Sequence, residues 1–237
     1  MTESSSEVRP AKCSHCERPM STPIVCDFCQ ALNAVPATTD YFALLDVPRR
    51  FDLDQQLLHR KFLALSQHAH PDFHTGDSPE VQQLSLRVCA ALNDAYRTLK
   101  DPARRAAYLL EVLGGKSSVE DKAVPEGFLG TMMMMQEEIA DAKEAGQQHE
   151  LDRLREVLQT QHDGLIHRIA GLFGEHQEAI ACNAVRKDFL GEIRRQVNAV
   201  SYVRKLLSLL GQLPARTVGL DAGGHGSAET GRDAEAR

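Results

Sequence analysis

Four cysteines near the start of the chain have the spacing of metal ligands. They form two Cys-x-x-Cys pairs, Cys13 with Cys16 and Cys26 with Cys29, separated by nine residues. Two such pairs supply four thiolates, which complete the tetrahedral shell of a structural site and leave no open catalytic position. We therefore expect one structural metal ion, with zinc favoured over iron, and a redox pair is the alternative. The cysteine segment, residues 12–33, has too few apolar residues to fold without its metal.

A second group with chemical potential is the tripeptide His70-Pro71-Asp72. The carboxylate of Asp72 can accept charge-assisted hydrogen bonds from an arginine of a partner, and His70 offers a donor beside it. Pro71 fixes the turn between them. Taken alone, the tripeptide is also explained by a polar turn between two helices, or by a metal role that His70 shares with His68 and His74.

The third group is a run of four methionines, Met132 to Met135, near the start of a predicted helix. Four consecutive residues of a helix cannot all face one core, so some of these side chains must be exposed. Exposed methionine is flexible and polarisable and suits protein recognition.

Composition excludes several function classes. The 237 residues carry a formal charge of −6, which opposes a general nucleic-acid binder. No apolar stretch is long enough to span a membrane, and the N-terminus lacks a secretory or transit signal, so we expect a cytoplasmic protein. In that reducing compartment, clustered cysteines are more often metal ligands than disulfides. No phosphate-binding loop or catalytic constellation is recognisable, which indicates a protein that is not an enzyme.

The elements that position these groups are predicted to be helices. Apolar content is 42%, aromatic content is only 5% and tryptophan is absent, which favours an all-α fold packed through aliphatic side chains. A capping box at Asp52 predicts a helix that ends before Pro71, and two further helices are expected from Pro79 to Lys100 and from Pro102 to Leu113. Beyond these, the periodicity predicts helices over about 125–145, 147–173 and 176–210.

These elements divide the chain into domains. We expect a small four-cysteine module, then a helical hairpin domain, a polar hinge and a C-terminal bundle of three helices, with disordered segments at both ends. The predicted boundaries are 1–11 for the disordered N-terminus, 12–33 for the metal-binding module, 40–113 for the hairpin domain, 116–124 for the hinge, 125–211 for the bundle and 212–237 for the disordered tail.

Residues 40–113 resemble a J-domain, the module that stimulates ATP hydrolysis by DnaK-type chaperones. The resemblance rests on "DYFALL" at Asp40, on His70-Pro71-Asp72 and on "NDAYRTLKDPARRAAYLL". By this resemblance the chaperone-binding residues are the tripeptide together with Arg60 and Lys61 on the preceding helix.

The whole span from Cys13 to Leu210 resembles the HscB family, the J-domain co-chaperones of iron–sulfur cluster biogenesis, in its metal-bearing form. "CDFCQALNAVPATTDYF", "HPDFH" and "AAYLLEVLGG" carry this likeness. It implies a co-chaperone that binds an IscU-type scaffold protein, delivers it to a DnaK-type chaperone, stimulates the chaperone's ATPase and so promotes cluster transfer. The scaffold-binding residues that it implies are Leu129, Met132, Met133, Glu137 and Tyr202.

Four alternatives stay open from the sequence. A general J-domain co-chaperone would deliver unfolded client proteins, although the chain has no Gly/Phe-rich linker. A zinc ribbon fused to a helical bundle would bind nucleic acid, but it requires a basic face. Leu129, Met133 and Tyr202 could belong to the bundle core instead of a surface. A homodimer also stays open.

Overall fold

The structure, a computed structural model, describes residues 12–22, 24–182 and 188–211. The segments predicted to be disordered, 1–11 and 212–237, lie outside the described residues. Within the described residues the fold is all-α, as predicted, apart from two isolated β-bridges, Lys12 with Pro19 and Val25 with Leu32. The helices are α1 (Tyr41–Leu44), α2 (Gln55–Ala69), the short 3₁₀ helix η1 (Pro71–His74), α3 (Pro79–Lys100), α4 (Pro102–Val112), α5 (Phe128–Glu144), α6 (Gln148–Ala181) and α7 (Phe189–Leu209).

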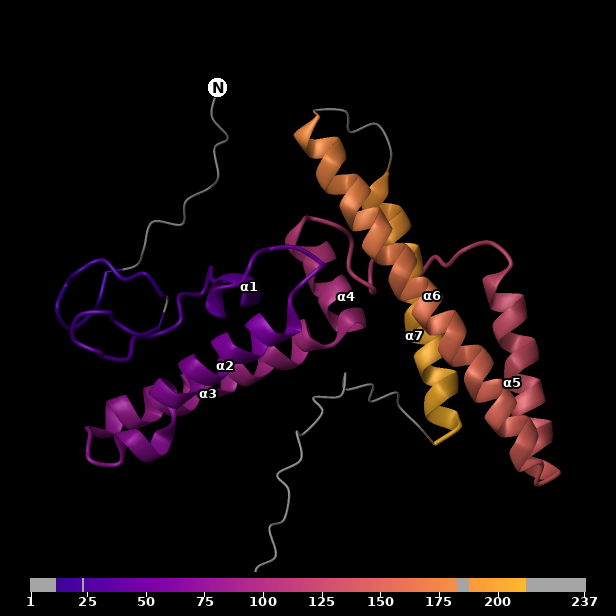
Figure 1. Cartoon of the computed structure of the whole chain (residues 1–237), viewed down its shortest axis with the longest axis horizontal. Helices are drawn as coiled ribbons and strands as arrows, with labels where there is room; N and C mark the ends of the chain where they lie inside the picture. Colours follow the sequence, from indigo (N-terminus) through magenta and orange to yellow (C-terminus); the bar gives the residue numbers. More distant parts are fainter. Residues whose placement is uncertain (1–11, 23, 183–187, 212–237) are drawn as a thin grey trace, which may run out of the picture.

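Helices α2 and α3 form a long hairpin, and Figure 1 shows the cysteine module beside its outer end. The predicted capping box at Asp52 is wrong. Asp54, directly before the helix, is the N-cap, and its carboxylate accepts the backbone N–H groups of Gln56 and Leu57 at 2.8 and 3.1 Å. A cap must lie immediately before the first turn to reach these amides, and Asp52 lies two residues too early.

Apolar side chains of α2 and α3 pack against each other. Leu58 and Ala69 of α2 and Leu92 and Ala95 of α3 have no exposed area. At the edge of this contact the ring of Phe62 stacks on that of Tyr96, with centroids 4.1 Å apart. The small alanines let the two helices approach closely.

The C-terminal bundle consists of α5, α6 and α7, and its middle helix is longer than predicted. We expected a break near residues 173–176, but α6 continues to Ala181. Phe173 and His176 are both buried in this helix, where Phe173 stacks on Phe51 and His176 lies edge-on to Phe189. A glycine within a helix costs about 1 kcal/mol relative to alanine, which is less than the burial of a phenylalanine contributes, so Gly174 does not end it.

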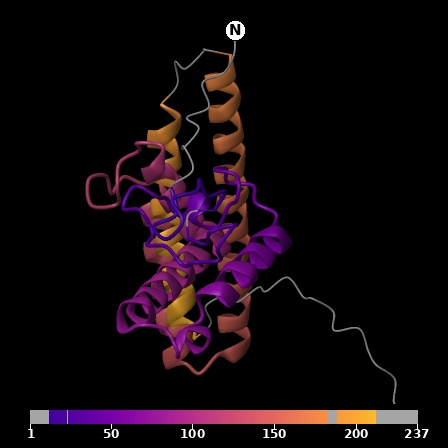
Figure 2. The ribbon, with the colours of Figure 1, turned by 90° about the vertical axis from the view of Figure 1, so that its left-hand side faces the viewer.

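The hairpin and the bundle meet where α4 and the loop before α2 contact α6 and α7 (Figures 1 and 2). Phe51 and Phe173 stack with centroids 5.3 Å apart. In a second contact, Arg204 of α7 donates to both carboxylate oxygens of Asp101, at 3.1 and 2.9 Å. Partial burial raises the pKa of Asp101, but the hydrogen bonds and charge of Arg204 outweigh it, and the pKa lies below its usual value.

The segment predicted as a polar hinge, residues 116–124, is attached to α7. Arg194, whose side chain is almost fully buried, donates from Nε to the carbonyl of Lys116 at 2.7 Å. Asn198 donates to the carbonyls of Asp121 and Ala123 at 2.9 and 2.8 Å. These hydrogen bonds attach three backbone carbonyls of the segment to α7.

No helix in the part of the chain that the structure describes has the length and apolar character needed to cross a membrane.

The contact between the two parts generates a first prediction. Replacing Arg204 by alanine should lower the free energy of unfolding by about 1 kcal/mol, because the bidentate pair is only partly exposed. The carboxyl pKa is depressed in the folded state, so the pair stabilises the fold above the unfolded pKa of Asp101. That stabilisation is lost as pH falls through the depressed folded value. The difference in the free energy of unfolding between Arg204→Ala and the natural protein should therefore vanish in acid.

Urea denaturation at neutral and acidic pH measures this difference. Arg104→Ala is the matched control, since Arg104 is more exposed and lies 3.9 Å from the same carboxylate. An equal loss in both variants would contradict a specific role for Arg204.

Candidate functional site

The four cysteines converge on one point. Their Sγ atoms all lie within 4.8 Å of one another, with Cys13 and Cys29 at 3.6 Å and Cys16 and Cys26 at 3.6 Å. Sulfur atoms about 2.3 Å from a tetrahedral metal ion lie about 3.8 Å apart. The donor set and its spacing therefore fit a single four-thiolate metal ion.

Each Cys-x-x-Cys pair is a tight turn of the same design. Glu17 donates to the carbonyl of Cys13 at 2.9 Å, and Gln30 donates to that of Cys26 at 3.0 Å. Both donors occupy the left-handed region, with φ of 59° and 58°. The two turns share the same hydrogen bond and the same left-handed residue, and their sulfurs meet at one point from two sides.

Hydrogen bonds prepare two of the sulfurs for the thiolate form. The backbone N–H of Cys16 is the main cause that lowers the pKa of Cys13 to about 6, and the N–H of Cys29 likewise lowers the pKa of Cys26. For Cys29 the N–H of Ala31 acts in the same direction, but burial and the neighbouring sulfurs raise the pKa to about 12. Four thiolates at this spacing repel one another, and a cation at their centre relieves the repulsion.

The module also contains a polar residue that the sequence analysis missed. Asn33 is buried, and its Oδ1 accepts both the backbone N–H and the hydroxyl of Ser14 at 2.8 Å. Its Nδ2 donates to the carbonyl of Ala31 at 2.9 Å and lies 3.7 Å from the sulfur of Cys13. It thus joins the first cysteine turn to the end of the module, as an outer-shell partner of the ligands.

The module has more apolar support than its composition suggests. Met20 is buried between the two cysteine turns, while Ile24, Val25 and Leu32 belong to the same core as the helical hairpin. One side of the module therefore packs against the helices. On its other side, the cysteines and Met20 form a separate small cluster.

The His70-Pro71-Asp72 turn lies at the outer end of the hairpin, remote from α5 (Figure 1). Nδ1 of His70 accepts the backbone N–H of Asp72 at 3.2 Å, so the neutral ring carries its hydrogen on Nε2. The side chains of His70 and Asp72 are 52% and 84% exposed. Both an imidazole N–H and a carboxylate are accordingly accessible to a partner.

The two cations predicted on α2 differ in their surroundings. Arg60 is exposed, whereas Lys61 lies 2.5 Å from the carboxylate of Asp46, within its own domain. A partner that uses Lys61 must compete with Asp46 for it.

The methionine run divides between the core and the surface. Met132 and Met135 are buried, whereas Met133 and Met134 are 64% and 63% exposed. Met132 was predicted among the scaffold-binding residues, but with only 4% of its surface exposed it cannot belong to an accessible surface. The interval of three places both buried methionines on the inner face of α5.

The other residues predicted for this surface are exposed. Leu129 and Tyr202 are 47% and 43% exposed, and Glu137 is exposed on the same helix. The ring of Tyr202 lies edge-on to that of Phe128, 6.3 Å away, which places it beside the start of α5. A core position for Leu129, Met133 and Tyr202 does not fit these exposures.

Comparison with known proteins identifies the relatives of this fold. Residues 124–198 match the family model described as the HSCB C-terminal oligomerisation domain. The "Co-chaperone protein HscB homolog" of Ralstonia nicotianae is 33% identical over 162 residues, which cover 67% of this chain and 92% of the relative. The chain belongs to the HscB co-chaperone family. The "Co-chaperone protein HscB" of Proteus mirabilis is 30% identical over 165 residues, covering 67% of this chain and 93% of the relative.

Solved structures of family members have the same fold. The crystal structure of human co-chaperone protein HscB superposes with a TM-score of 0.71, at 22% identity, covering 85% of this chain and 97% of the human one. Chaperone HscB from Vibrio cholerae gives a TM-score of 0.58 at 26% identity, covering 73% and 96%. The relatives are named co-chaperones and not enzymes.

The metal module generates a second prediction. We expect one bound metal ion per chain, and its removal should unfold residues 12–22 while the helical domains keep their structure, because this part of the module lies outside the core that residues 24–32 share with the helices. Elemental analysis of protein purified under reducing conditions measures the stoichiometry, and amide hydrogen exchange with and without a chelator measures the unfolding. Cys89→Ser is the control, since Cys89 lies on α3 away from the cluster. Protein that contains no stoichiometric metal would refute the prediction.

Proposed function

We propose that this co-chaperone acts as an adaptor in iron–sulfur cluster biogenesis. It binds an IscU-type scaffold protein at one end, presents it to a DnaK-type chaperone at the other and stimulates that chaperone's ATPase, which promotes transfer of the cluster. The observation that carries the proposal is the presence of two exposed, chemically different surfaces at opposite ends of one connected helical body.

The chaperone-binding end is the His70-Pro71-Asp72 turn with Arg60 and Lys61. Exposure of the Asp72 carboxylate and of the His70 Nε2–H supports this role, because both can form charge-assisted hydrogen bonds with a partner. The proposed J-domain is residues 40–113.

The scaffold-binding end is the exposed surface formed by Leu129, Met133 and Tyr202, with Glu137 at its edge. Two of its members are one turn apart on α5, and the third lies on α7 next to Phe128. Large exposed apolar side chains grouped in this way are typical of a protein-binding surface. The proposed scaffold-binding domain is residues 125–211.

The metal is proposed to be zinc, held by all four cysteines. A closed four-thiolate shell has no position for a substrate and suits a structural zinc ion, whose role here is to fold the module. We place the protein in a reducing, cytoplasmic compartment, where the thiols stay available to the metal.

The chaperone-binding end is tested by His70→Gln. This variant should stimulate the ATPase of a DnaK-type chaperone at least about tenfold less, because it removes the imidazole donor from a charge-assisted contact. Scaffold binding should be unchanged, since α5 and α7 are remote from the turn. Single-turnover ATP hydrolysis and a scaffold-binding titration measure the two effects, and undiminished stimulation would mean that the tripeptide is only a turn.

The scaffold-binding end is tested by replacing Leu129, Met133 and Tyr202 together by alanine. Affinity for an IscU-type scaffold should fall by at least ~2 kcal/mol, as expected of a central anchor cluster. The melting temperature should change little, because exposed side chains leave no cavity.

Met132→Ala is the matched control for this experiment. Met132 is buried on the same helix, so its loss should lower the melting temperature and leave the affinity intact. Calorimetric titration and thermal melts separate the two outcomes. Unchanged affinity in the triple variant, or recovery of unfolded client proteins in place of a scaffold, would favour a general J-domain co-chaperone.

A further inference from the structure

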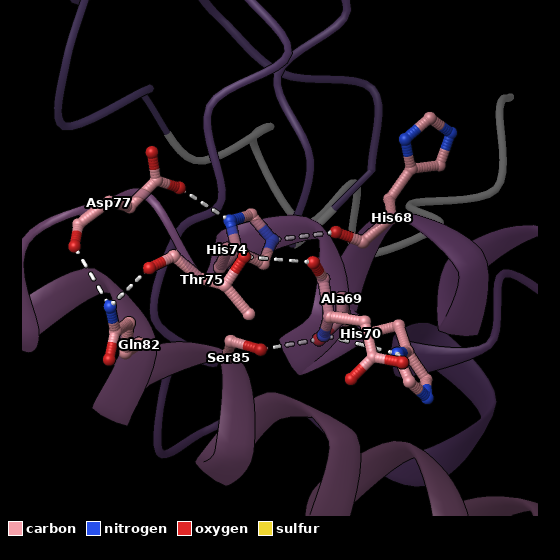
Figure 3. Close-up of polar contacts among 9 residues, drawn as sticks. His68, Ala69, His70, His74, Thr75, Asp77, Gln82 and Ser85 are labelled. Atoms are coloured by element: carbon pink, nitrogen blue, oxygen red, sulfur yellow. Dashed lines mark hydrogen bonds and ion pairs between the residues drawn. The ribbon is translucent and has the colours of Figure 1, made fainter.

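A second histidine in the same turn has no part in the proposed contacts with partners. His74 ends the 3₁₀ helix η1, and its side chain is only 14% exposed. Its Nδ1 lies 2.7 Å from the carboxylate oxygen Oδ2 of Asp77, and its Nε2 lies 3.0 Å from the backbone carbonyl oxygen of His68 (Figure 3).

Both atoms that face the ring are hydrogen-bond acceptors. A neutral imidazole has one N–H, so one of the two contacts would bring a nitrogen lone pair against an oxygen lone pair. The protonated ring has two N–H groups and satisfies both contacts. The hydrogen bond with Asp77 is the main cause that raises the pKa of His74 above its ordinary value, which agrees with this geometry.

Asp77 is the charged group that acts on the His74 ring. From α2 the ring meets the carbonyl of His68, whose own imidazole is turned away (Figure 3). From α3 the turn is faced by the neutral side chains of Gln82 and Ser85. Within the turn, Asp72 lies nearest to His70, at 3.6 Å from its Nδ1.

The contacts of His74 span the whole turn. One nitrogen holds the last turn of α2, and the other holds the loop that leads to α3. That loop is also held by Gln82, whose Nε2 donates to the carbonyls of Thr75 and Asp77 at 3.1 and 3.0 Å. The tripeptide therefore lies inside a loop that the His74 imidazolium closes.

We propose that His74, in its protonated form, is a positioning residue that clamps the turn between α2 and α3 and so fixes the direction in which His70 and Asp72 face the chaperone. The role in chaperone binding rests on the function proposed above, whereas the clamp itself does not.

The clamp makes the turn sensitive to pH. The pKa of the folded form is raised, so the stabilisation is complete below the ordinary pKa of histidine, 6.5, and is lost as pH rises through the raised folded value. Order in the turn, and with it stimulation of the chaperone, should decrease over that interval.

The clamp is tested first without any partner. Residue-resolved NMR titration of the full-length protein gives the pKa of His74, and amide hydrogen exchange gives the order of residues 70–77. We expect a raised pKa that Asp77→Asn returns toward the ordinary value. In His74→Gln, which can donate only from one end, exchange in the turn should rise about tenfold, as for the loss of a hydrogen bond to a charged group.

His68→Ala is the matched control, because His68 offers the clamp only its carbonyl, which alanine keeps. Its turn should exchange as slowly as that of the natural protein. An ordinary pKa for His74, or equal exchange in His74→Gln and the natural protein, would overturn the clamp.

Stimulation of a DnaK-type chaperone is then measured against pH. In His74→Gln it should be about tenfold lower and no longer follow the titration of His74. In Asp77→Asn the decrease should begin at lower pH, a shift that titration of His70 would not produce, since Asp77 does not contact His70.

The two proposals fail in different ways. A natural protein that stimulates no chaperone at any pH overturns the proposed function, and the NMR experiment still decides the clamp. A His74→Gln variant that stimulates as well as the natural protein, with the same pH profile, overturns the positioning role alone.

Discussion

A single carboxylate, that of Asp101, links the two halves of this molecule at their junction. Asp101 caps α4, accepting the backbone N–H groups of Ala103 and Arg104, and the same side chain receives both nitrogens of the Arg204 fork from α7. Asp101 therefore both caps α4, the last helix of the hairpin domain, and attaches that domain to the bundle. Together with the stacking of Phe51 on Phe173, this contact favours one direction of α4 against α7.

The junction between the two halves matters for the adaptor role proposed above. Arg194 and Asn198 join the connecting segment 116–124 to α7 by hydrogen bonds, which favours a constant separation between the turn at one end and the apolar surface at the other. A fixed separation allows a co-chaperone to present its cargo to the chaperone in one orientation, with no loss of conformational entropy at the connection on binding.

The features predicted well from the sequence are those set by local patterns. The apolar stripes of α2 and α3, the cysteine pairs and the exposed part of the methionine run follow from periodicity and spacing. The sequence predictions failed or were incomplete where the local structure is determined by contacts with residues distant in the sequence. Gly174 stays helical because Phe51, more than a hundred residues away in sequence, covers the neighbouring Phe173. The hydrogen bonds from Arg194 and Asn198 to the carbonyls of residues 116–124 could not be predicted from the local sequence either. No local signal marks Asn33 or His74, because their partners come from other turns of the chain.

The end of α2 explains why the turn needs such partners. Pro71 stops the helix, but no glycine follows to cap it, so the last carbonyls must find donors elsewhere. The carbonyl of Ala69 receives the Ser85 hydroxyl at 2.7 Å and the Cys89 thiol at 3.0 Å, and that of His68 receives His74. Each donor comes from a segment beyond the proline, so satisfying the helix end also folds the chain back over it. The order of the His70-Pro71-Asp72 turn is thus a consequence of how this helix terminates, and the tripeptide needs no rigidity of its own to stay exposed and directed outward.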